Sequence, residues 1–252
     1  MLDSGHRILH FERIDSTNAE ARRLTQAGEA GPLWIVADEQ TGGRGRLGRS
    51  WVSEPGNLYA TLLFSTSAGP EAAAQVSFVA ALAVHEAVST LLPHRHTAIK
   101  WPNDVLVDGA KICGILAEVA GNAPVVLALG CGLNIAHFPE GTPYPVTSLV
   151  TEGASAAVPE VFEALDASFS RHLAIWNDGA GFGHIRKLWE QNAIGLGEAV
   201  TIHSGDQQIS GLFDGLALDG ALIVSLANGT HRTIHAGDVR FAAVEALRQR
   251  RA

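Results

Sequence analysis

Short apolar runs alternate with amphipathic segments along the first three quarters of the chain, and glycine, proline or polar residues separate them. The apolar runs predict strands over 8–13, 33–37, 58–64, 97–100, 104–107, 111–119 and 124–135. Helical spacing predicts helices over 17–27, 159–176 and 182–192, and an alanine-rich helix that opens at Pro70 and stops at Pro93. Because strands and helices are intermixed, this part of the chain predicts an α/β (α+β) domain with a mixed β-sheet flanked by helices.

The pattern changes after Gly195. Turn signals at 204–206, 219–220 and 228–229 divide residues 198–244 into short strands, and no helical periodicity appears before the charged tail 248–251. We expect a small five-stranded barrel here, with a domain boundary near 193–196. The chain would then consist of a catalytic-type domain over residues 1–194 and a β-domain over residues 195–252.

A capping signal opens the first helix. Thr17-Asn18-Ala19-Glu20 fits a capping box, in which the Thr17 hydroxyl accepts from an orphan amide and Glu20 reaches back. Capping alone would explain these residues, but a helix N-terminus that faces a pocket can also bind a ligand.

Composition and charge narrow the class of protein. Hydrophobic residues make up 46% and charged residues 17% of the 252, which excludes a disordered chain. The net charge of −8 argues against a protein that binds nucleic acid through an overall positive surface potential. Gln75, His85 and Glu86 interrupt the apolar segment 71–92, so we expect no membrane helix, and the N-terminus shows no signal-peptide pattern.

The two cysteines, Cys113 and Cys131, form no CxxC motif and lie among apolar neighbours. We expect both to be small buried hydrophobes in a reducing compartment, and alkylation would block a site that either one borders. Together with the absence of a signal pattern, this predicts a cytoplasmic protein.

A glycine–arginine stretch, QTGGRGRLGRSW over 40–51, carries the first chemical signal. It contains GxGxxG and nearly a P-loop, but both motifs need a helix to begin at the last glycine. Here the stretch leads into Pro55-Gly56 and then a strand, so neither applies. A flexible loop whose arginines close over an anionic ligand fits better. A solvated surface loop, or a small nucleic-acid contact, is the alternative.

A lysine at the end of a predicted strand is the second signal. Lys100 precedes Trp101-Pro102-Asn103-Asp104, and its ammonium should project at the rim of the sheet. Since Pro102 excludes regular structure there, the turn can wall a nucleotide pocket. A solvated strand end with a packed Trp101 is the alternative.

Five short elements follow one another over about 120 residues: DSTN at 15–18, GRGRLGRSW at 43–51, KWPND at 100–104, KICGIL at 111–116 and GCGLN at 130–134. In this order they resemble the biotin protein ligase family, and the resemblance extends to the small C-terminal domain. It implies a catalytic domain like that of class II aminoacyl-tRNA synthetases and an SH3-like β-barrel at the C-terminus.

The resemblance also implies a two-step reaction. Biotin and ATP, with Mg²⁺, would give biotinyl-5′-AMP and pyrophosphate, and biotin would then pass to a lysine of a biotin carboxyl carrier protein or domain. The implied biotin-binding residues are Ser16, Thr17, Asn18, Gln40, Arg44, Gly45, Arg46 and Lys100. The implied ATP- and adenylate-binding residues are Arg46, Arg49, Trp51, Asn103, Lys111, Gly114 and Asn134.

Lys100 and Arg46 are the expected catalytic residues. A carboxylate that attacks phosphorus needs no general base, so catalysis depends on bringing two anions together and stabilising charge. No metal ligand is assigned, and Asp104 is equally a metal ligand or a cap of its turn.

Several alternatives stay open at this point. A lipoate or octanoate ligase of the same superfamily shares the chemistry, although the intact GRGRLGR favours biotin. A non-catalytic biotin-binding module would not need both Lys100 and Arg46, and a nucleic-acid-binding protein is disfavoured by the charge. Because the DSTN element starts at residue 15, we expect no DNA-binding domain and no operator binding; a homodimer is compatible with such a ligase.

Overall fold

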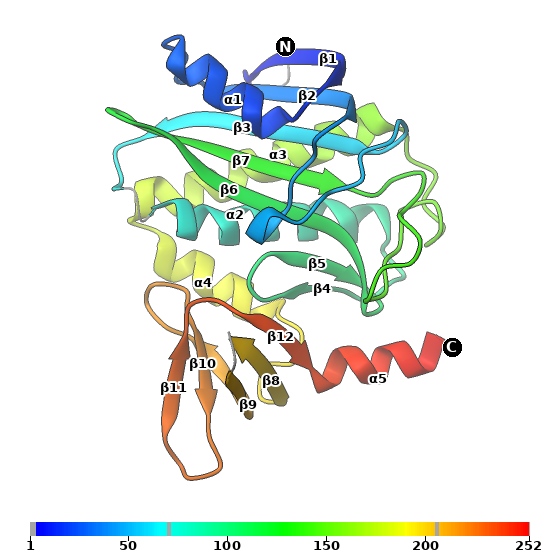
Figure 1. The fold of residues 1–252 in the computed structure, drawn as a ribbon, viewed down its shortest axis with the longest axis vertical. Helices are drawn as coiled ribbons and strands as arrows, with labels where there is room; N and C mark the ends of the chain where they lie inside the picture. Colours follow the sequence, from blue (N-terminus) through cyan, green and yellow to red (C-terminus); the bar gives the residue numbers. More distant parts are fainter. Residues whose placement is uncertain (1–3, 70–71, 205–206, 252) are drawn as a thin grey trace.

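A seven-stranded mixed sheet forms the centre of the larger part of the molecule (Figure 1). The computed structural model describes residues 4–69, 72–204 and 207–251. The strand order is β1-β2-β3-β7-β6-β5-β4, and only the β1–β2 pair is parallel. The strands are β1 (Arg7–Ile14), β2 (Leu33–Gln40), β3 (Leu58–Thr66), β4 (Thr97–Lys100), β5 (Asp104–Val107), β6 (Ala110–Asn122) and β7 (Val125–Leu133).

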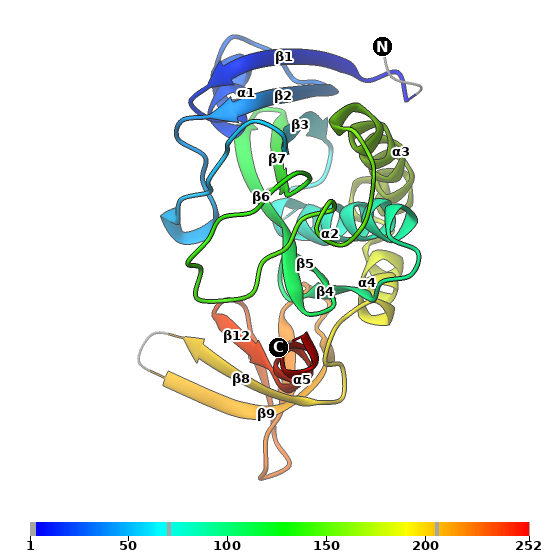
Figure 2. The same cartoon turned by 90° about the vertical axis from the view of Figure 1, so that its right-hand side faces the viewer.

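Helices cover both faces of this sheet, which confirms the predicted mixed sheet flanked by helices. In Figure 2, α1 (Thr17–Gln26) lies on one side of the sheet and α2 (Ala72–Leu91) and α3 (Val158–Trp176) lie on the other. Helix α4 (Phe182–Gln191) packs against α2 and α3. The main core lies between the sheet and α2, whereas a smaller apolar cluster lies beneath α1. The sheet therefore has a thinly covered face at α1, and the polar site described below lies there.

Helix α2 has the length and hydropathy of a membrane-spanning helix by composition alone. In the fold, 61% of its most apolar window is buried inside the protein. Packing against the sheet and two helices accounts for its apolar character, because a helix that is apolar all round needs cover on all sides. The predicted start of this helix at Pro70 lies outside the described residues.

The C-terminal part forms a second, antiparallel sheet in the order β11-β10-β9-β8-β12. Its strands are β8 (Ala199–Ser204), β9 (Gln207–Leu216), β10 (Leu222–Ser225), β11 (His231–Ile234) and β12 (Asp238–Phe241). The five predicted strands are present, with turns at 219–220 and 228–229; of the third turn signal, 205–206 lie outside the described residues. Closure of this sheet into a barrel stays a prediction.

The final helix is longer than the sequence analysis predicted. Helix α5 (Ala242–Arg251) begins directly after β12, within the segment predicted to contain only strands. The residues Ala242, Ala243, Ala246 and Leu247 are strong helix formers, and Val244 and Leu247 lie three positions apart on the side that packs against the core. The apolar residues at the start of this helix, 242–244, were wrongly predicted to belong to a strand.

The two sheets share one hydrophobic core, so no gap in the packing separates them. The Trp101 indole donates to the carbonyl of Gly220 at 3.1 Å, and a Cβ on Gly220 would lie 2.6 Å from the Phe78 ring. The backbone of Ile194 also donates to Ile99 O in β4. A boundary near 193–196 between units 1–194 and 195–252 stays a prediction.

A buried tryptophan allows one test of what stabilises the larger part. The Trp34 ring packs edge-on against Phe162 and Phe169, and its Nε1 donates to buried Asp166 at 2.7 Å. We expect Trp34→Phe to lower the free energy of unfolding by about 2–4 kcal/mol, because a buried carboxylate loses a donor and the ring shrinks. Urea denaturation measures this loss.

Trp189→Phe is the matched control. Trp189 is also fully buried, but its Nε1 has no hydrogen-bond partner among the described residues. The same loss of volume should therefore cost less at this position. Equal losses in the two variants would contradict the role of the Trp34–Asp166 hydrogen bond.

Candidate functional site

The N-terminus of α1 is capped by Ser16, one residue earlier than predicted. The Ser16 hydroxyl accepts from the backbone N–H of Ala19 at 3.4 Å, and Thr17 is the first helical residue. The Glu20 side chain binds Arg23 at 2.6 Å instead of reaching back. The predicted capping box at Thr17–Glu20 is therefore wrong. Both Ser16 and Thr17 carry a hydroxyl suited to an N-cap, and tertiary contacts of Thr17 leave the cap to Ser16.

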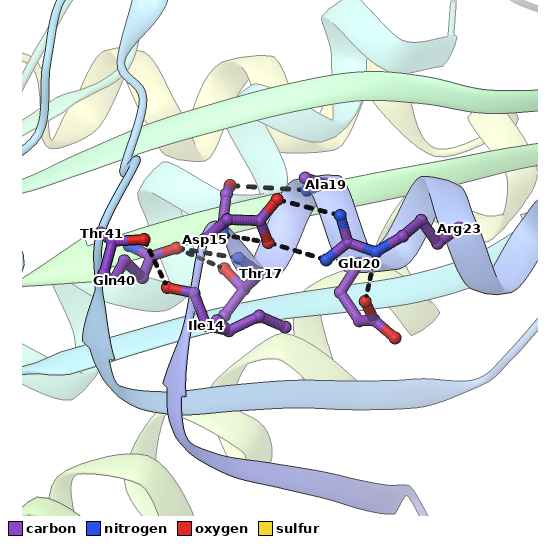
Figure 3. Close-up of polar contacts among 9 residues, drawn as sticks. Ile14, Asp15, Thr17, Ala19, Glu20, Arg23, Gln40 and Thr41 are labelled. Carbon is purple, nitrogen blue, oxygen red and sulfur yellow. Dashed lines mark hydrogen bonds and ion pairs between the residues drawn. The ribbon is translucent and has the colours of Figure 1, made fainter.

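The Thr17 hydroxyl instead faces Gln40 at the end of β2. Gln40 Oε1 accepts from the Thr17 backbone N–H at 2.9 Å and lies 3.1 Å from its Oγ1. Arg23 holds the preceding residue, Asp15, through two hydrogen bonds of 2.9 and 2.7 Å, which lowers the pKa of Asp15 to about 2. These contacts join the end of β1, the start of α1 and the end of β2 into one corner (Figure 3).

Three glycines on β6 and β7 form the floor beside this corner. A Cβ on Gly130 would lie 2.1 Å from the Asn18 Oδ1. A Cβ on Gly132 or Gly114 would lie 2.4 or 2.8 Å from the Trp51 indole. None of the three has a positive φ, so the requirement for glycine comes from space. Because these three positions carry no side chain, Asn18 and Trp51 can lie directly against the backbone of the sheet.

The glycine–arginine loop leaves β2 and returns to β3 without forming an α-helix, as the sequence context predicted. A bridge between Arg44 and Ser50 and a hydrogen bond from Gly45 N to Arg49 O hold its two arms together. A short 3₁₀ turn, η1 (Arg46–Gly48), forms its tip. The loop is a closed hairpin in this structure.

Two contacts attach the loop to the opposite wall. Arg46 donates to Asn103 Oδ1 at 3.2 Å, and Asn103 in turn donates to the carbonyl of Ile115. Arg49 binds both oxygens of Asp238 in the C-terminal sheet at 2.9 and 2.8 Å. Burial lowers the pKa of Arg46, whereas the Asp238 carboxylate raises that of Arg49. The loop therefore spans from the seven-stranded sheet to the C-terminal sheet.

Two lysines and one aspartate lie at the far end of the cleft. Lys111 binds Asp104 at 2.7 Å and lies over the rings of Trp51 and Tyr144. Lys100 is the last residue of β4 and pairs with Asp104 through the strand backbone, but its ammonium has no hydrogen bond or ion pair to any described residue. Burial lowers the pKa of Lys100, and the nearby Asp104 opposes this shift. Because Asp104 is paired with Lys111, Lys100 keeps its ammonium available for an anion.

All but one of the predicted site residues line a single cleft of about 1020 Å³, open solvent at its mouth included. They are Ser16, Thr17, Asn18, Gln40, Arg44, Gly45, Arg46, Arg49, Trp51, Lys100, Asn103, Asp104, Lys111 and Gly114. The exception is Asn134, whose buried amide donates to Thr147 O. Its predicted nucleotide contact stays a prediction.

Three residues at the site were missed by the sequence analysis. Thr61 of β3 and Glu118 of β6 bind Asn18, and Asp238 binds Arg49. A lone threonine in an apolar strand is an ordinary strand residue, and the two acidic residues lie outside the motifs. Only the strand register of the folded protein shows that these residues lie next to the predicted site residues.

The comparisons with known proteins agree with this geometry. Residues 10–134 match the biotin/lipoate A/B protein ligase family, and residues 195–241 match the biotin protein ligase C-terminal domain. The chain is 42% identical to a biotin–[acetyl-CoA-carboxylase] ligase of Paracoccus denitrificans, over 91% of this chain and 98% of that protein. The chain therefore belongs to the biotin protein ligase family.

Solved structures of the family have the same fold. The biotin protein ligase of Aquifex aeolicus in complex with biotin and ATP is 27% identical, with a TM-score of 0.77 over 94% of this chain and 99% of that one. The enzyme of Leishmania major in complex with biotinyl-5-AMP is 26% identical, with a TM-score of 0.63 over 91% and 99%.

The cysteines provide a test of how closed the cleft floor is. Cys131 lines the cleft, yet burial raises its pKa to about 12, and burial also raises the pKa of Cys113. At pH 8 the thiolate fraction of Cys131 should fall about a thousandfold below that of an ordinary thiol. We expect iodoacetamide to leave both cysteines unmodified in the folded protein, as measured by mass spectrometry. Denaturation first should give two adducts, and an adduct on Cys131 in the folded protein would show that the floor is accessible.

Proposed function

We propose that this chain activates biotin with ATP to biotinyl-5′-AMP, with release of pyrophosphate, and then transfers biotin to a lysine of a carrier protein. The observation that carries this proposal is one cleft with two chemically different ends. The end at α1 offers uncharged polar groups, and the other end offers a cluster of cations. Such a cleft suits a molecule with a neutral polar head and a carboxylate that meets a nucleotide.

The first step joins two anions. A carboxylate oxygen of biotin attacks the α-phosphorus of ATP, and the bond from that phosphorus to pyrophosphate breaks. Lys100 has no ion-pair partner among the described residues, so its charge is available to both anions. An ammonium already held at this point needs little reorganisation as charge builds up.

The arginines of the loop complete the anion site. Arg46 reaches the far wall through Asn103, so it lies where the carboxylate and the α-phosphate would meet. Arg49 and Lys111 are held by carboxylates and would bind the polyphosphate or the adenylate. A loop closed over the mixed anhydride also excludes water, which would hydrolyse it.

Magnesium fits this site as a companion of ATP. The carboxylates lining the cleft are Asp104 and Asp238, and each is already bound to a cation. Among the described residues no cluster of three metal-ligating side chains exists. Mg²⁺ commonly keeps its waters and binds through substrate phosphates with one or two carboxylates, so Asp104 would be its protein ligand. When bound it would neutralise phosphate charge.

The second step forms an amide. The amine of the acceptor lysine attacks the acyl carbon, the bond to the AMP oxygen breaks, and the amine loses a proton. The name of the Paracoccus relative points to acetyl-CoA carboxylase as the source of the acceptor. No nucleic acid or membrane partner belongs to this proposal, and cytoplasmic location and a homodimer stay predictions.

Biotin-dependent exchange between ATP and pyrophosphate tests the proposed function. With Mg²⁺ present we expect exchange with biotin and at least a hundredfold less with lipoate or octanoate, because the polar end at α1 has no partner in a dithiolane ring or an alkyl chain. Exchange with lipoate alone would move the chain to the lipoate ligases. No exchange with any acid in folded protein would favour the biotin-binding module.

The pH dependence of this exchange tests Lys100. The pKa of Lys100 is lowered by burial, and the ammonium is the form that binds anions. We therefore expect kcat/KM for biotin to fall as the pH rises through a value below the ordinary lysine pKa of 10.5. Lys100→Arg should shift this alkaline limb upward, and Lys100→Met should reduce exchange by about a thousandfold or more.

Lys187→Met is the matched control, since Lys187 is exposed on α4 and lies outside the cleft. It should leave both the rate and the pH profile unchanged. Exchange near the normal level in Lys100→Met would contradict the role assigned to Lys100.

A further inference from the structure

A buried hydroxyl lies behind the polar end of the cleft. Thr61 is in the middle of β3, opposite Gly130 in the β3–β7 ladder, and it is completely buried. Its Oγ1 lies 2.7 Å from Asn18 Oδ1 and 2.8 Å from Thr17 Oγ1. Thr61 does not line the cleft, so it acts on the cleft only through these two neighbours.

The orientation of the Asn18 amide is determined from the far side. Its Nδ2 lies 2.7 Å from Glu118 Oε2 and 3.3 Å from Leu116 O, and both of these atoms only accept. Arg22 donates to the same Glu118 oxygen at 2.8 Å and keeps the carboxylate in place. The Asn18 NH₂ must therefore face Glu118, and Oδ1 must face Thr61.

The proton positions follow from this arrangement. Since Asn18 Oδ1 cannot donate, the single hydroxyl proton of Thr61 goes to it. The 2.8 Å contact of this hydroxyl with Thr17 Oγ1 is a second arm of the same donation, so one Thr61 hydroxyl binds both Asn18 and Thr17. The Thr17 hydroxyl donates in turn to Gln40 Oε1 at 3.1 Å, the oxygen that also accepts the Thr17 N–H. Gln40 therefore binds the Thr17 proton, and the Thr17 hydroxyl presents its remaining lone pair to the cleft.

The Ser16 hydroxyl has the opposite hydrogen-bonding role to the Thr17 hydroxyl. Its Oγ accepts from Ala19 N as the helix cap, and no described residue accepts its own proton. Ser16 thus offers a donor to the cleft, beside the acceptor offered by Thr17. A cyclic urea carries a carbonyl acceptor next to N–H donors, and it matches this donor–acceptor pair.

We infer that Thr61 and Glu118 are positioning residues that make the cleft selective for a cyclic urea. Glu118 orients Asn18, and Thr61 donates to both Asn18 and Thr17. Thr61 thereby holds the Thr17 hydroxyl, whose own proton is bound by Gln40, where it can accept from the ligand. This inference rests on the proposed function, since biotin supplies the cyclic urea. Neither residue lines the cleft, and neither lies in the five motif elements.

Thr61→Val tests the inference, because valine keeps the branched shape and removes the hydroxyl. In the exchange assay we expect KM for biotin to rise at least tenfold, with kcat and KM for ATP within twofold of normal. KM for desthiobiotin, which keeps the cyclic urea and lacks the sulfur ring, should rise by the same factor. Thr61→Ser restores the hydroxyl and should return KM for biotin to within threefold of normal.

Thr66→Val is the matched control on the same strand. Thr66 is also buried, and its hydroxyl donates to Asp178 outside the cleft. It should leave KM for biotin unchanged. Glu118→Met acts at the other end of the hydrogen-bond chain, on a side chain that is about one third exposed, and should raise KM for biotin several-fold.

Two kinds of result would overturn the inference, and they can be told apart. A normal KM for biotin in Thr61→Val or, if that variant does not fold, in Glu118→Met would remove the positioning role while the normal enzyme still activates biotin. Equal rises in Thr61→Val and Thr61→Ser would trace the effect to packing and have the same consequence. Activation of lipoate in place of biotin by the normal enzyme would overturn the proposed function, and with it the selectivity for a urea.

Discussion

The absence of side chains at three adjacent positions of the sheet determines where this site can be. Gly114 and Gly132 pair in the β6–β7 ladder, and Gly130 lies on the same strand two residues before Gly132. Asn18 and Trp51 occupy the space that their Cβ atoms would need. The amide thus reaches the backbone of β6 and the side chain of Glu118, and the indole forms one wall of the cleft. An ordinary strand surface would push α1 and the loop away and separate the polar groups from the cations.

Electrostatics then distinguishes this cleft from the rest of the molecule. The chain has a net charge of −8, yet the cleft is lined by five cationic side chains and two carboxylates, a local excess of three positive charges. The two carboxylates bind the outer cations, Lys111 and Arg49, so these stay ordered without a ligand. Lys100 is left without an ion-pair partner among the described residues, and its lowered pKa reflects the cost of burying it. A carboxylate or phosphate that enters would recover this cost, which is why the same arrangement binds anions and prepares them to react.

Much of this could be predicted from the sequence, because the signals were local. Apolar runs bounded by turns marked the strands, and the predicted site residues, apart from Asn134, line the cleft. Signals that depended on tertiary context failed. Ser16 and Thr17 are both hydroxyl residues of the kind preferred at an N-cap, and the contacts of Thr17 with Gln40 and Thr61 decide between them. Thr61 and Glu118 gave no signal, because their role arises from strand register across 56 residues of intervening chain.

The C-terminal sheet is joined to the site by more than a linker. Residues 237–239 line the cleft, Asp238 holds the loop through Arg49, and Gly220 accepts from Trp101 beside Lys100. The Arg49–Asp238 pair is more than half exposed, so it contributes about 0–1 kcal/mol to stability. Its importance is geometric, since a weak contact can open when a polyphosphate offers Arg49 a stronger partner. The buried Trp101 contact and the shared core would hold the two sheets together while the loop moves, so the loop can open without displacing Lys100.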